Sequence, residues 1–98
     1  MSHDIMIDLE TLGTTADSVI LSIGAVRFNL DTSCVFDGLG DTFYQVITID
    51  DQSKRHISGY TLAWWMGQSK ASQAVFTDDS CTLNDTLFDL TAWIDPMP

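Results

Sequence analysis

The sequence predicts an α/β protein with an α+β layout, in which an antiparallel meander of three strands precedes two or three helices. Three apolar segments rich in β-branched residues occupy the first half, and only polar loops separate them. Helix-capping residues followed by helically spaced apolar residues stand in the second half. Consecutive strands that are joined without a helix pair antiparallel, so this order favours a meander. The length of 98 residues is that of one small domain.

The three expected strands differ in their apolar patterns. Residues 4–9 carry apolar side chains in both alternation phases, which is typical of a strand buried on both faces. After a turn over 13–17, the segment "SVILSIGAVRF", residues 18–28, is the clearest strand because β-branched residues dominate it. A polar loop over 29–40 precedes the third strand, residues 41–48. Alternation in this strand predicts two faces, one with Phe43, Gln45 and Ile47 and the other with Tyr44 and Val46.

Capping residues and apolar spacing predict helices over about 61–76 and 83–94. We expect Thr61 to cap the first helix and Ser69 to cap its second piece. Thr82 and Asp85 have the spacing of a capping box at the start of the last helix. This helix should then bury an apolar stripe and end before Pro96, the stripe being Leu83, Leu87, Leu90 and Ile94.

Charge and composition exclude several classes of protein. Fourteen acidic and four basic residues give a formal net charge of −10, so the chain lacks the basic patch of an ordinary nucleic-acid-binding protein. No apolar run is long enough to span a bilayer and no signal-peptide pattern is evident, so we expect a cytoplasmic protein without membrane contact. Cys34 and Cys81 lack metal-site spacing, which favours free thiols but leaves a disulfide open.

Two acids end the first strand-like segment, in "DIMIDLETLG". Asp8 and Glu10 are two residues apart, so on a strand both carboxylates point to one face, about 7 Å apart along it. Carboxylate pairs of this kind suit Mg²⁺ or Mn²⁺, and two such ions can support phosphodiester hydrolysis. The alternative is that Asp8 begins a turn and Glu10 is simply solvated, which is the commoner outcome for an arbitrary D-x-E.

Two longer matches accompany this pair. "IDLETLG" followed by "ADSVILSIGAVRF" resembles the Exo I region of the DEDD-type 3′–5′ exonucleases, which have a ribonuclease H-like fold. "YTLAWWMGQSKASQAVF" is similar to the small phage and bacterial exoribonuclease branch of that superfamily, where a T-x-x-W-W helix follows the third strand. Together the matches cover about residues 4–76. The resemblance therefore implies a nuclease that acts on a nucleic-acid 3′ end with Mg²⁺ or Mn²⁺ as cofactor.

The resemblance also implies roles for individual residues. Asp8 would bridge two metal ions and Glu10 would bind one, which makes both catalytic residues. Thr11 and Leu12 match positions that touch the 3′-terminal nucleotide through backbone and side chain. Trp64 and Trp65 match the paired tryptophans of the family. At least one of these rings is expected to pack in the core, whereas a base-stacking ring would have to be exposed.

Several parts of the family pattern are missing. The Exo II and Exo III acids and the general base have no clear counterpart, so we expect residues 1–98 to form a partial, N-terminal exonuclease-like domain with very weak or absent hydrolysis. "NDTLFDL" is a near match to Exo II, but its spacing is one residue too long, and we expect Asp89 on the outer face of a helix. His3 and His56 are weak candidates for the base.

Two further expectations follow from this reading. In the complete family fold the first strand is central, so here it should form an exposed edge that pairs with a protein partner or with a second copy. The alternative function is a non-catalytic acidic phage protein descended from such a nuclease, which inhibits a nucleic-acid-handling complex as anti-CRISPR nucleic-acid mimics do. That alternative depends on size and net charge alone.

Overall fold

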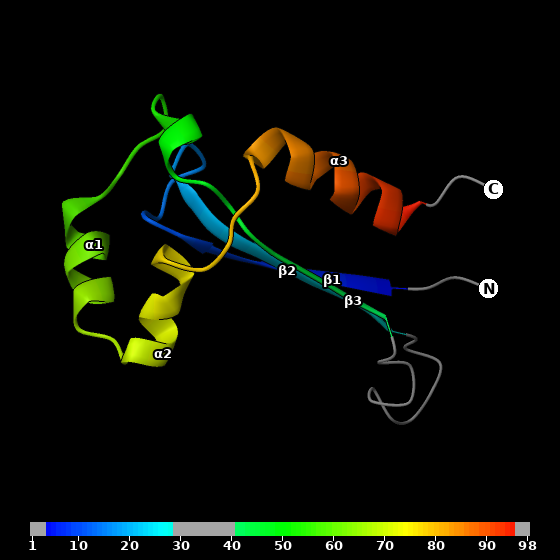
Figure 1. The fold of residues 1–98 in the computed structure, drawn as a ribbon, viewed down its shortest axis with the longest axis horizontal. Coiled ribbons are helices and arrows are strands. Elements are labelled where there is room, and N and C mark those ends of the chain that lie inside the picture. The colour runs from blue at the N-terminus through cyan, green and yellow to red at the C-terminus, as the bar shows by residue number, and fades with distance from the viewer. Residues whose placement is uncertain (1–3, 29–40, 96–98) are drawn as a thin grey trace.

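The computed structural model describes residues 4–28 and 41–95. These form a three-stranded antiparallel sheet and a set of helices, which confirms the predicted meander followed by helices. Figure 1 shows the sheet at the centre, α3 along it, and α1 and α2 grouped near one end. The elements are β1 (Asp4–Thr11), β2 (Ile20–Phe28), β3 (Thr42–Val46), η2 (Asp50–Gln52), α1 (Gly59–Met66), α2 (Lys70–Gln73), η3 (Ala74–Phe76) and α3 (Leu83–Ile94).

The sheet has the order β1-β2-β3, so β1 and β3 are its edges. Asp8 of β1 lies opposite Gly24 of β2, which lies opposite Tyr44 of β3. The next row on the same face contains Glu10, Ser22 and Val46. The register between β1 and β2 is regular as far as Glu10 and shifts between Glu10 and Thr11. The loop predicted over 29–40 lies outside the described residues, as do Cys34, His3 and Pro96.

The expectation that residues 4–9 are buried on both faces is wrong. Met6, Ile7 and Leu9 are exposed over 62%, 48% and 45% of their surface, and Ile5 alone among the apolar residues of β1 packs against a core cluster. A strand with apolar side chains on both faces is buried only when layers cover both of them. In the described residues β1 lacks a neighbouring strand on its outer side, so the predicted exposed edge is confirmed.

Two clusters of buried side chains hold the helices to the sheet. One joins the sheet to α1 and η3 through Leu12, Val19, Leu21, Val46, Trp65 and Val75. The other joins the opposite face to α3 through Ile23, Ala25, Ile47 and Leu90, with Phe43 and Trp93 packed against it. Val46 and Ile47 fall in different clusters, so the two predicted faces of the third strand are confirmed.

Tertiary pairing moves several predicted boundaries. The Val19 amide donates to the His56 carbonyl and the His56 amide donates to the Asp17 carbonyl, so β2 starts at Ile20 instead of residue 18. Ile47 still donates to Leu21 of β2, but the Thr48 amide donates to the Cys81 carbonyl and the Cys81 amide donates to the Val46 carbonyl, and β3 ends at Val46 instead of residue 48. The two helical pieces predicted over 61–76 are three in the structure, α1, α2 and η3. In the described parts of the chain, no helix is both long and apolar enough to cross a membrane.

The helix caps are partly as predicted. Ser69 caps α2 and the side chain of Thr82 accepts a hydrogen bond from the Asp85 amide at the start of α3, as expected. The cap of α1 is Ser58, whose hydroxyl accepts from the Thr61 amide, so the prediction of Thr61 as the cap is wrong by one turn. Ser58 has the extended backbone that a cap needs, and this starts α1 at Gly59.

The apolar stripe predicted for α3 is also wrong in part. Leu90 is buried and Leu83 packs on the sheet, but Leu87 and Ile94 are exposed. The buried face follows residues three and four apart through Leu83, Thr86, Leu90 and Trp93. Thr86 can be buried because its hydroxyl donates to the Thr82 carbonyl at 2.8 Å.

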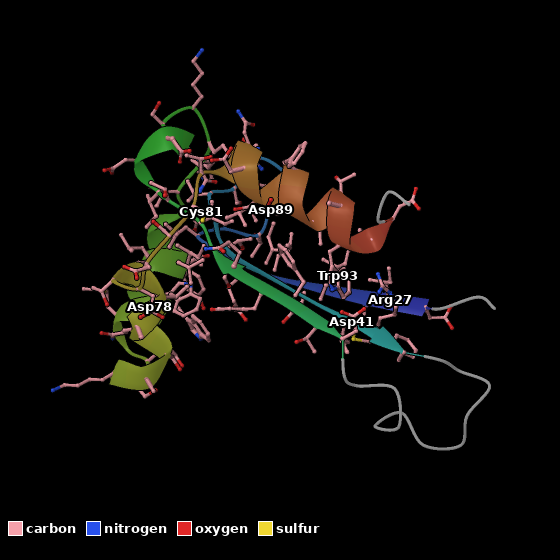
Figure 2. All side chains as sticks on the ribbon, turned by 45° about the vertical axis from the view of Figure 1, so that its right-hand side comes forward. Arg27, Asp41, Asp78, Cys81, Asp89 and Trp93 are labelled. Carbon is pink, nitrogen blue, oxygen red and sulfur yellow. The ribbon has the colours of Figure 1, made fainter. Side chains whose placement is uncertain are left out.

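Arg27 ties the C-terminal end of α3 to the sheet, as the labelled side chains in Figure 2 show. Its guanidinium forms an ion pair with Asp41, donates to the Trp93 carbonyl and lies over the Trp93 ring, 4.5 Å from the centroid. The Trp93 indole N–H donates to the second Asp41 oxygen at 2.8 Å. A cation beside the last carbonyls of a helix also interacts favourably with the helix dipole.

We expect Arg27→Met to destabilise the domain by about 1–2 kcal/mol, since it removes the charged hydrogen bonds while keeping most of the apolar stem. Arg27→Lys should recover less than half of this loss because an ammonium cannot bond two partners in the plane of a guanidinium. Urea unfolding measures both values. The network would be irrelevant to stability if Arg27→Met unfolded at the same urea concentration as the parent protein.

Candidate functional site

Asp8 and Glu10 stand on the face of β1 that continues onto Gly24 and Ser22 of β2. Because β1 is regular up to Glu10, both side chains project from the same face of the strand. Both residues are exposed. Gly24 presents no side chain beside Asp8, and a Cβ built on it would meet the Tyr44 ring at 3.7 Å. The space next to Asp8 is therefore bounded by an aromatic ring and by backbone.

The charges near this pair leave it available to a cation. Within residues 4–28 and 41–95, the single ion pair joins Arg27 to Asp41, and neither Asp8 nor Glu10 contacts a lysine or arginine. Two adjacent carboxylates without a basic partner are a donor set that suits a hard divalent ion. In the same ranges no group of three or more potential ligands gathers. Within the described residues, Asp8 and Glu10 are therefore the two carboxylates that would hold such an ion.

A cleft of about 340 Å³ opens beside Glu10. The sheet forms its floor with Ser22 and Tyr44, and α1, α2 and the segment after η3 form its walls. Aromatic and polar side chains line these walls, namely Trp64, Trp65, Gln68, Ser72 and Asp78. The carboxylate of Glu10 thus shares a concave surface with an exposed indole ring.

The two tryptophans have different environments. Trp65 is 5% exposed, packs edge-on against Phe76 with ring centroids 5.6 Å apart, and donates its indole N–H to the Thr11 carbonyl at 3.0 Å. Trp64 is 53% exposed and meets Trp65 edge-on at 5.2 Å. The expectation that at least one ring packs in the core is confirmed for Trp65. Trp64 has the exposure that stacking on a base requires.

Thr11 and Leu12 are held by the fold. The Leu12 side chain is 2% exposed, its N–H donates to the Val19 carbonyl, and its carbonyl accepts from the Ser58 amide. The Thr11 hydroxyl donates to the Gly13 carbonyl at 2.6 Å. Their contact with a 3′-terminal nucleotide stays a prediction, and in this conformation their visible role is to fix the chain after Glu10.

The loop after β1 is fixed by Arg55. Its guanidinium donates to the carbonyls of Ser18 and Ala16 at 2.9 and 2.8 Å. A 2.5 Å hydrogen bond from the Thr15 hydroxyl holds the pKa of Asp17 in this loop below its usual range, and His56 and Arg55 act in the same direction. Because the pKa of Asp17 is lower in the folded state than in the unfolded state, its carboxylate stabilises the fold at pH values above the unfolded pKa. This stabilisation is lost as the pH falls through the folded pKa.

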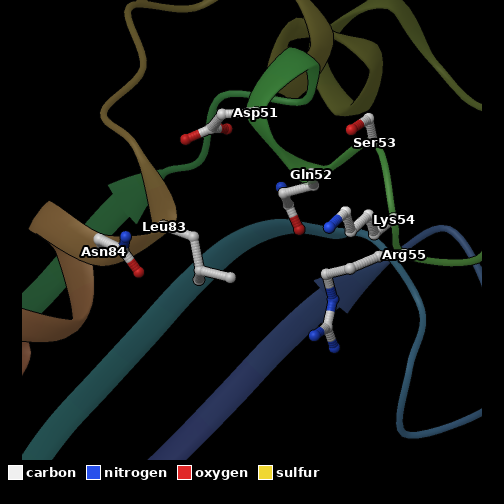
Figure 3. A pocket seen from close by; sticks show the side chains of 7 residues that line it. All are labelled: Asp51, Gln52, Ser53, Lys54, Arg55, Leu83 and Asn84. Carbon is white, nitrogen blue, oxygen red and sulfur yellow. The ribbon is translucent and has the colours of Figure 1, made fainter.

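A second cavity, of about 250 Å³, is shown in Figure 3. It contains Lys54 and Arg55 beside Asp51, Gln52 and Asn84. Arg55 donates hydrogen bonds to the backbone of the loop after β1, and Gln52 donates to the carbonyls of Ile20 and Thr48. The polar groups of Arg55 and Gln52 in this cavity therefore serve to hold the backbone in place.

The remaining sequence candidates are not gathered at Asp8. Asp89 is exposed on α3, which packs on the opposite face of the sheet, so its predicted outward position is confirmed. His56 is exposed, and its backbone pairs with the segment around Asp17 and Val19.

Sequence reasoning missed two residues of the cleft. Tyr44 was placed on the correct face of its strand, but the register that sets it beside Gly24 and Asp8 was not predicted. Asp78 follows η3 in an irregular segment with no pattern to mark it, and only tertiary structure brings it to the cleft of Glu10.

The comparisons with known proteins give one match. A family model described as a 3′–5′ exoribonuclease Rv2179c-like domain matches residues 3–97. No curated protein and no solved structure matches the chain. The family is one of DEDD-type, ribonuclease H-like exonucleases, and the match covers both segments that carry the resemblance seen in the sequence. The chain therefore belongs to the Rv2179c-like family of 3′–5′ exoribonuclease domains.

Proposed function

We propose that this protein is a divalent-metal-dependent 3′–5′ exonuclease domain that uses Asp8 and Glu10 as metal ligands and acts on the 3′ end of RNA. The observation that carries the proposal is the pair of exposed carboxylates on one face of β1, free of any described basic partner. The family match over residues 3–97 supports the reaction class, and its description supports RNA over DNA.

Each residue of the proposed site has a defined task. Asp8 and Glu10 would be the protein ligands of bound Mg²⁺ or Mn²⁺. Bound Mg²⁺ or Mn²⁺ would neutralise charge that develops on the phosphate and lower the pKa of a water molecule. The exposed ring of Trp64, in the same cleft as Glu10, would stack on a base near the 3′ end. Trp65 would hold Thr11 and thereby the end of the strand that bears both acids.

The described ligand set sets a limit on activity. Two carboxylates hold Mg²⁺ weakly, and no third acid joins them within residues 4–28 and 41–95. We therefore expect metal binding in the millimolar range, on the order of 1 mM, and very slow or absent hydrolysis by the 98-residue chain.

Thermal melts with Mn²⁺ test the site. If the dissociation constant is about 1 mM, about 10 mM Mn²⁺ should stabilise the fold by about 1.4 kcal/mol, which corresponds to a rise in Tm of about 5–10 °C. Asp8→Asn should abolish the rise. The matched control is Asp4→Asn, which removes the same charge from the same face of β1 and should keep the rise.

The outcomes separate a site from general charge screening. A Tm rise of equal size in the parent, Asp8→Asn and Asp4→Asn would mean that Mn²⁺ only screens the net charge of −10 and would overturn the metal site. Degradation of 3′-labelled RNA and DNA oligonucleotides by each variant then measures activity and substrate. Rapid hydrolysis that survives Asp8→Asn would contradict the proposed roles.

The alternative of an acidic inhibitor of a nucleic-acid-handling complex is supported only by the small size and the net charge of −10. It predicts no Mn²⁺ response and a salt-sensitive complex with a basic protein that also binds nucleic acid. The same melts therefore distinguish the two functions.

A further inference from the structure

The cleft beside Glu10 has a chemistry that the proposed function uses only in part. Its volume of about 340 Å³ is at the lower end of small-molecule pockets, which span roughly 300–1,000 Å³. Among the described residues that line it, two are acidic, Glu10 and Asp78, and none is basic. An acidic surface repels phosphate groups. The cleft therefore suits the uncharged part of a nucleotide, its base or sugar, better than the phosphate.

Two aromatic side chains give this cleft surfaces on which a base can stack. Tyr44, on the floor, is 63% exposed, and Trp64, on the wall formed by α1, is 53% exposed. Stacking on an aromatic ring accepts every base, because each base has a π-face. Selection between bases must then come from polar groups that meet the edge of the base.

Asp78 is held near these rings by the core. Its backbone N–H donates to the Ala74 carbonyl at 2.8 Å, so the residue is tied to η3. Phe76 of η3 packs edge-on against Trp65, the neighbour of Trp64 in α1. Figure 2 shows Asp78 beside α1 and α2, and it lines the same cleft as Trp64. Packed side chains therefore set the position of Asp78 relative to Trp64.

The carboxylate of Asp78 is available to a ligand. Asp78 is exposed, and in the part of the chain that the structure describes the single ion pair joins Arg27 to Asp41, so Asp78 has no basic partner there. No group of three or more potential metal ligands forms among the same residues, so Asp78 is not gathered with Asp8 and Glu10 at one metal site. An ionised carboxylate accepts hydrogen bonds but cannot donate them. Asp78 can therefore recognise a ligand through the donor groups of that ligand.

The four RNA bases differ in the donors that they offer at their edges. Adenine, cytosine and guanine each carry an exocyclic amino group, whereas uracil has a carbonyl oxygen on both sides of its single N–H. A carboxylate accepts hydrogen bonds from an amino group, as aspartate does from cytosine N4, and is repelled by a carbonyl oxygen. A carboxylate beside a base-stacking surface therefore disfavours uracil.

We propose that Asp78 is a specificity-determining residue, which favours a base with an exocyclic amino group over uracil at the 3′ end of RNA. The base stacks on Trp64, and its amino group donates a hydrogen bond to the Asp78 carboxylate. This assignment rests on the proposed function, because it names the substrates that the cleft beside Glu10 selects. The metal ligands remain Asp8 and Glu10.

Cytidine and uridine are the matched probes, because both are pyrimidine nucleosides and one carries an amino group where the other carries a carbonyl. Neither has a phosphate, so their binding needs no metal ion and meets no repulsion from the net charge of −10. Titration of the whole chain in metal-free buffer, followed by the NMR signal of the Trp64 indole, measures each dissociation constant. We expect cytidine to bind about tenfold more tightly than uridine, which is the usual effect of one hydrogen bond to a charged group.

Asp78→Asn keeps the shape of the side chain but adds a donor that can meet the uracil carbonyl. It should weaken cytidine binding and strengthen uridine binding until the two affinities agree within about twofold. Asp79→Asn is the matched control, since it removes the same charge from the next residue, which does not line the cleft, and it should keep the tenfold preference. Both residues are exposed, so neither variant should change the Tm appreciably.

Equal affinity of the parent protein for the two nucleosides, or a preference for cytidine that survives Asp78→Asn, would overturn the assignment. A Trp64 signal that moves with neither nucleoside would also overturn it, because the cleft would then take no base. The metal site is tested separately by the Mn²⁺ melts, in which Asp78→Asn should keep the rise in Tm that Asp8→Asn abolishes. Loss of that rise in Asp78→Asn would make Asp78 a metal ligand and would contradict its assigned role.

Discussion

Trp65→Ala is expected to destabilise the domain by about 3–5 kcal/mol, which is the usual loss when a buried tryptophan is truncated. Trp65 is the aromatic centre of the cluster between the sheet and α1, and its ring meets Phe76 and Trp64 edge-on. The substitution also leaves the Thr11 carbonyl without its indole donor. A small domain has so little stability to spare that we expect a largely unfolded protein, measured by urea unfolding and circular dichroism.

Trp64→Ala is the matched control, since it removes the same side chain from the neighbouring position. Trp64 is 53% exposed, so the substitution should lower the free energy of unfolding by less than about 1 kcal/mol. If Trp64 stacks on a base, this variant should fold but bind a single-stranded RNA oligonucleotide about tenfold more weakly, in line with stacking worth 1–3 kcal/mol. Equal destabilisation by the two variants would contradict the different roles assigned to the two rings.

Gln52→Leu is expected to destabilise the fold by about 2–4 kcal/mol, because it leaves buried backbone groups without partners. The Gln52 side chain is 4% exposed and accepts from the Ile20 amide at 2.9 Å while it donates to the Ile20 and Thr48 carbonyls at 2.8 and 3.0 Å. The Gln52 amide group thus bonds to the backbone of Ile20 as a residue of a neighbouring strand would. Leucine has similar volume but can replace none of the three hydrogen bonds.

Gln52→Glu separates the loss of hydrogen bonds from the loss of volume. It keeps the acceptor for Ile20 but turns a second oxygen toward two carbonyls, so burial and these carbonyls should raise the pKa of the new carboxyl group. The variant should therefore lose stability as the pH rises above about 4, where the unfolded chain ionises. Unfolding at pH 4 and pH 7 measures this. If the difference in free energy of unfolding between Gln52→Glu and the parent protein were the same at both pH values, the contacts assigned to Gln52 would be contradicted.

Local chemistry made several features predictable from the sequence. The β-branched run before Phe28, the caps Ser69 and Thr82 and the bounds of the last helix depend on neighbours in the chain, and the structure has them as predicted. The common face of Asp8 and Glu10 follows from the two-residue period of a strand, which needs no tertiary information.

Features that depend on distant contacts were not predictable. Whether the apolar side chains of β1 are buried depends on which other elements pack over them, and the sequence of β1 alone does not contain this information. The choice between Leu87 and Thr86 as the buried residue of α3 depends on how the helix is rotated over the sheet. A threonine is acceptable there because a carbonyl of its own helix accepts its hydroxyl proton, a contact that hydrophobic spacing cannot reveal.

The sequence by itself determined that two carboxylates share one face of the first strand, and that this strand heads an antiparallel meander followed by helices. Only the tertiary structure decided which surface surrounds them: Tyr44 through the register of β3, and Trp64 and Asp78 through the packing of the segments after it. Alternation along a strand is set by the backbone of each residue, whereas a cleft is set by contacts between residues far apart in the chain.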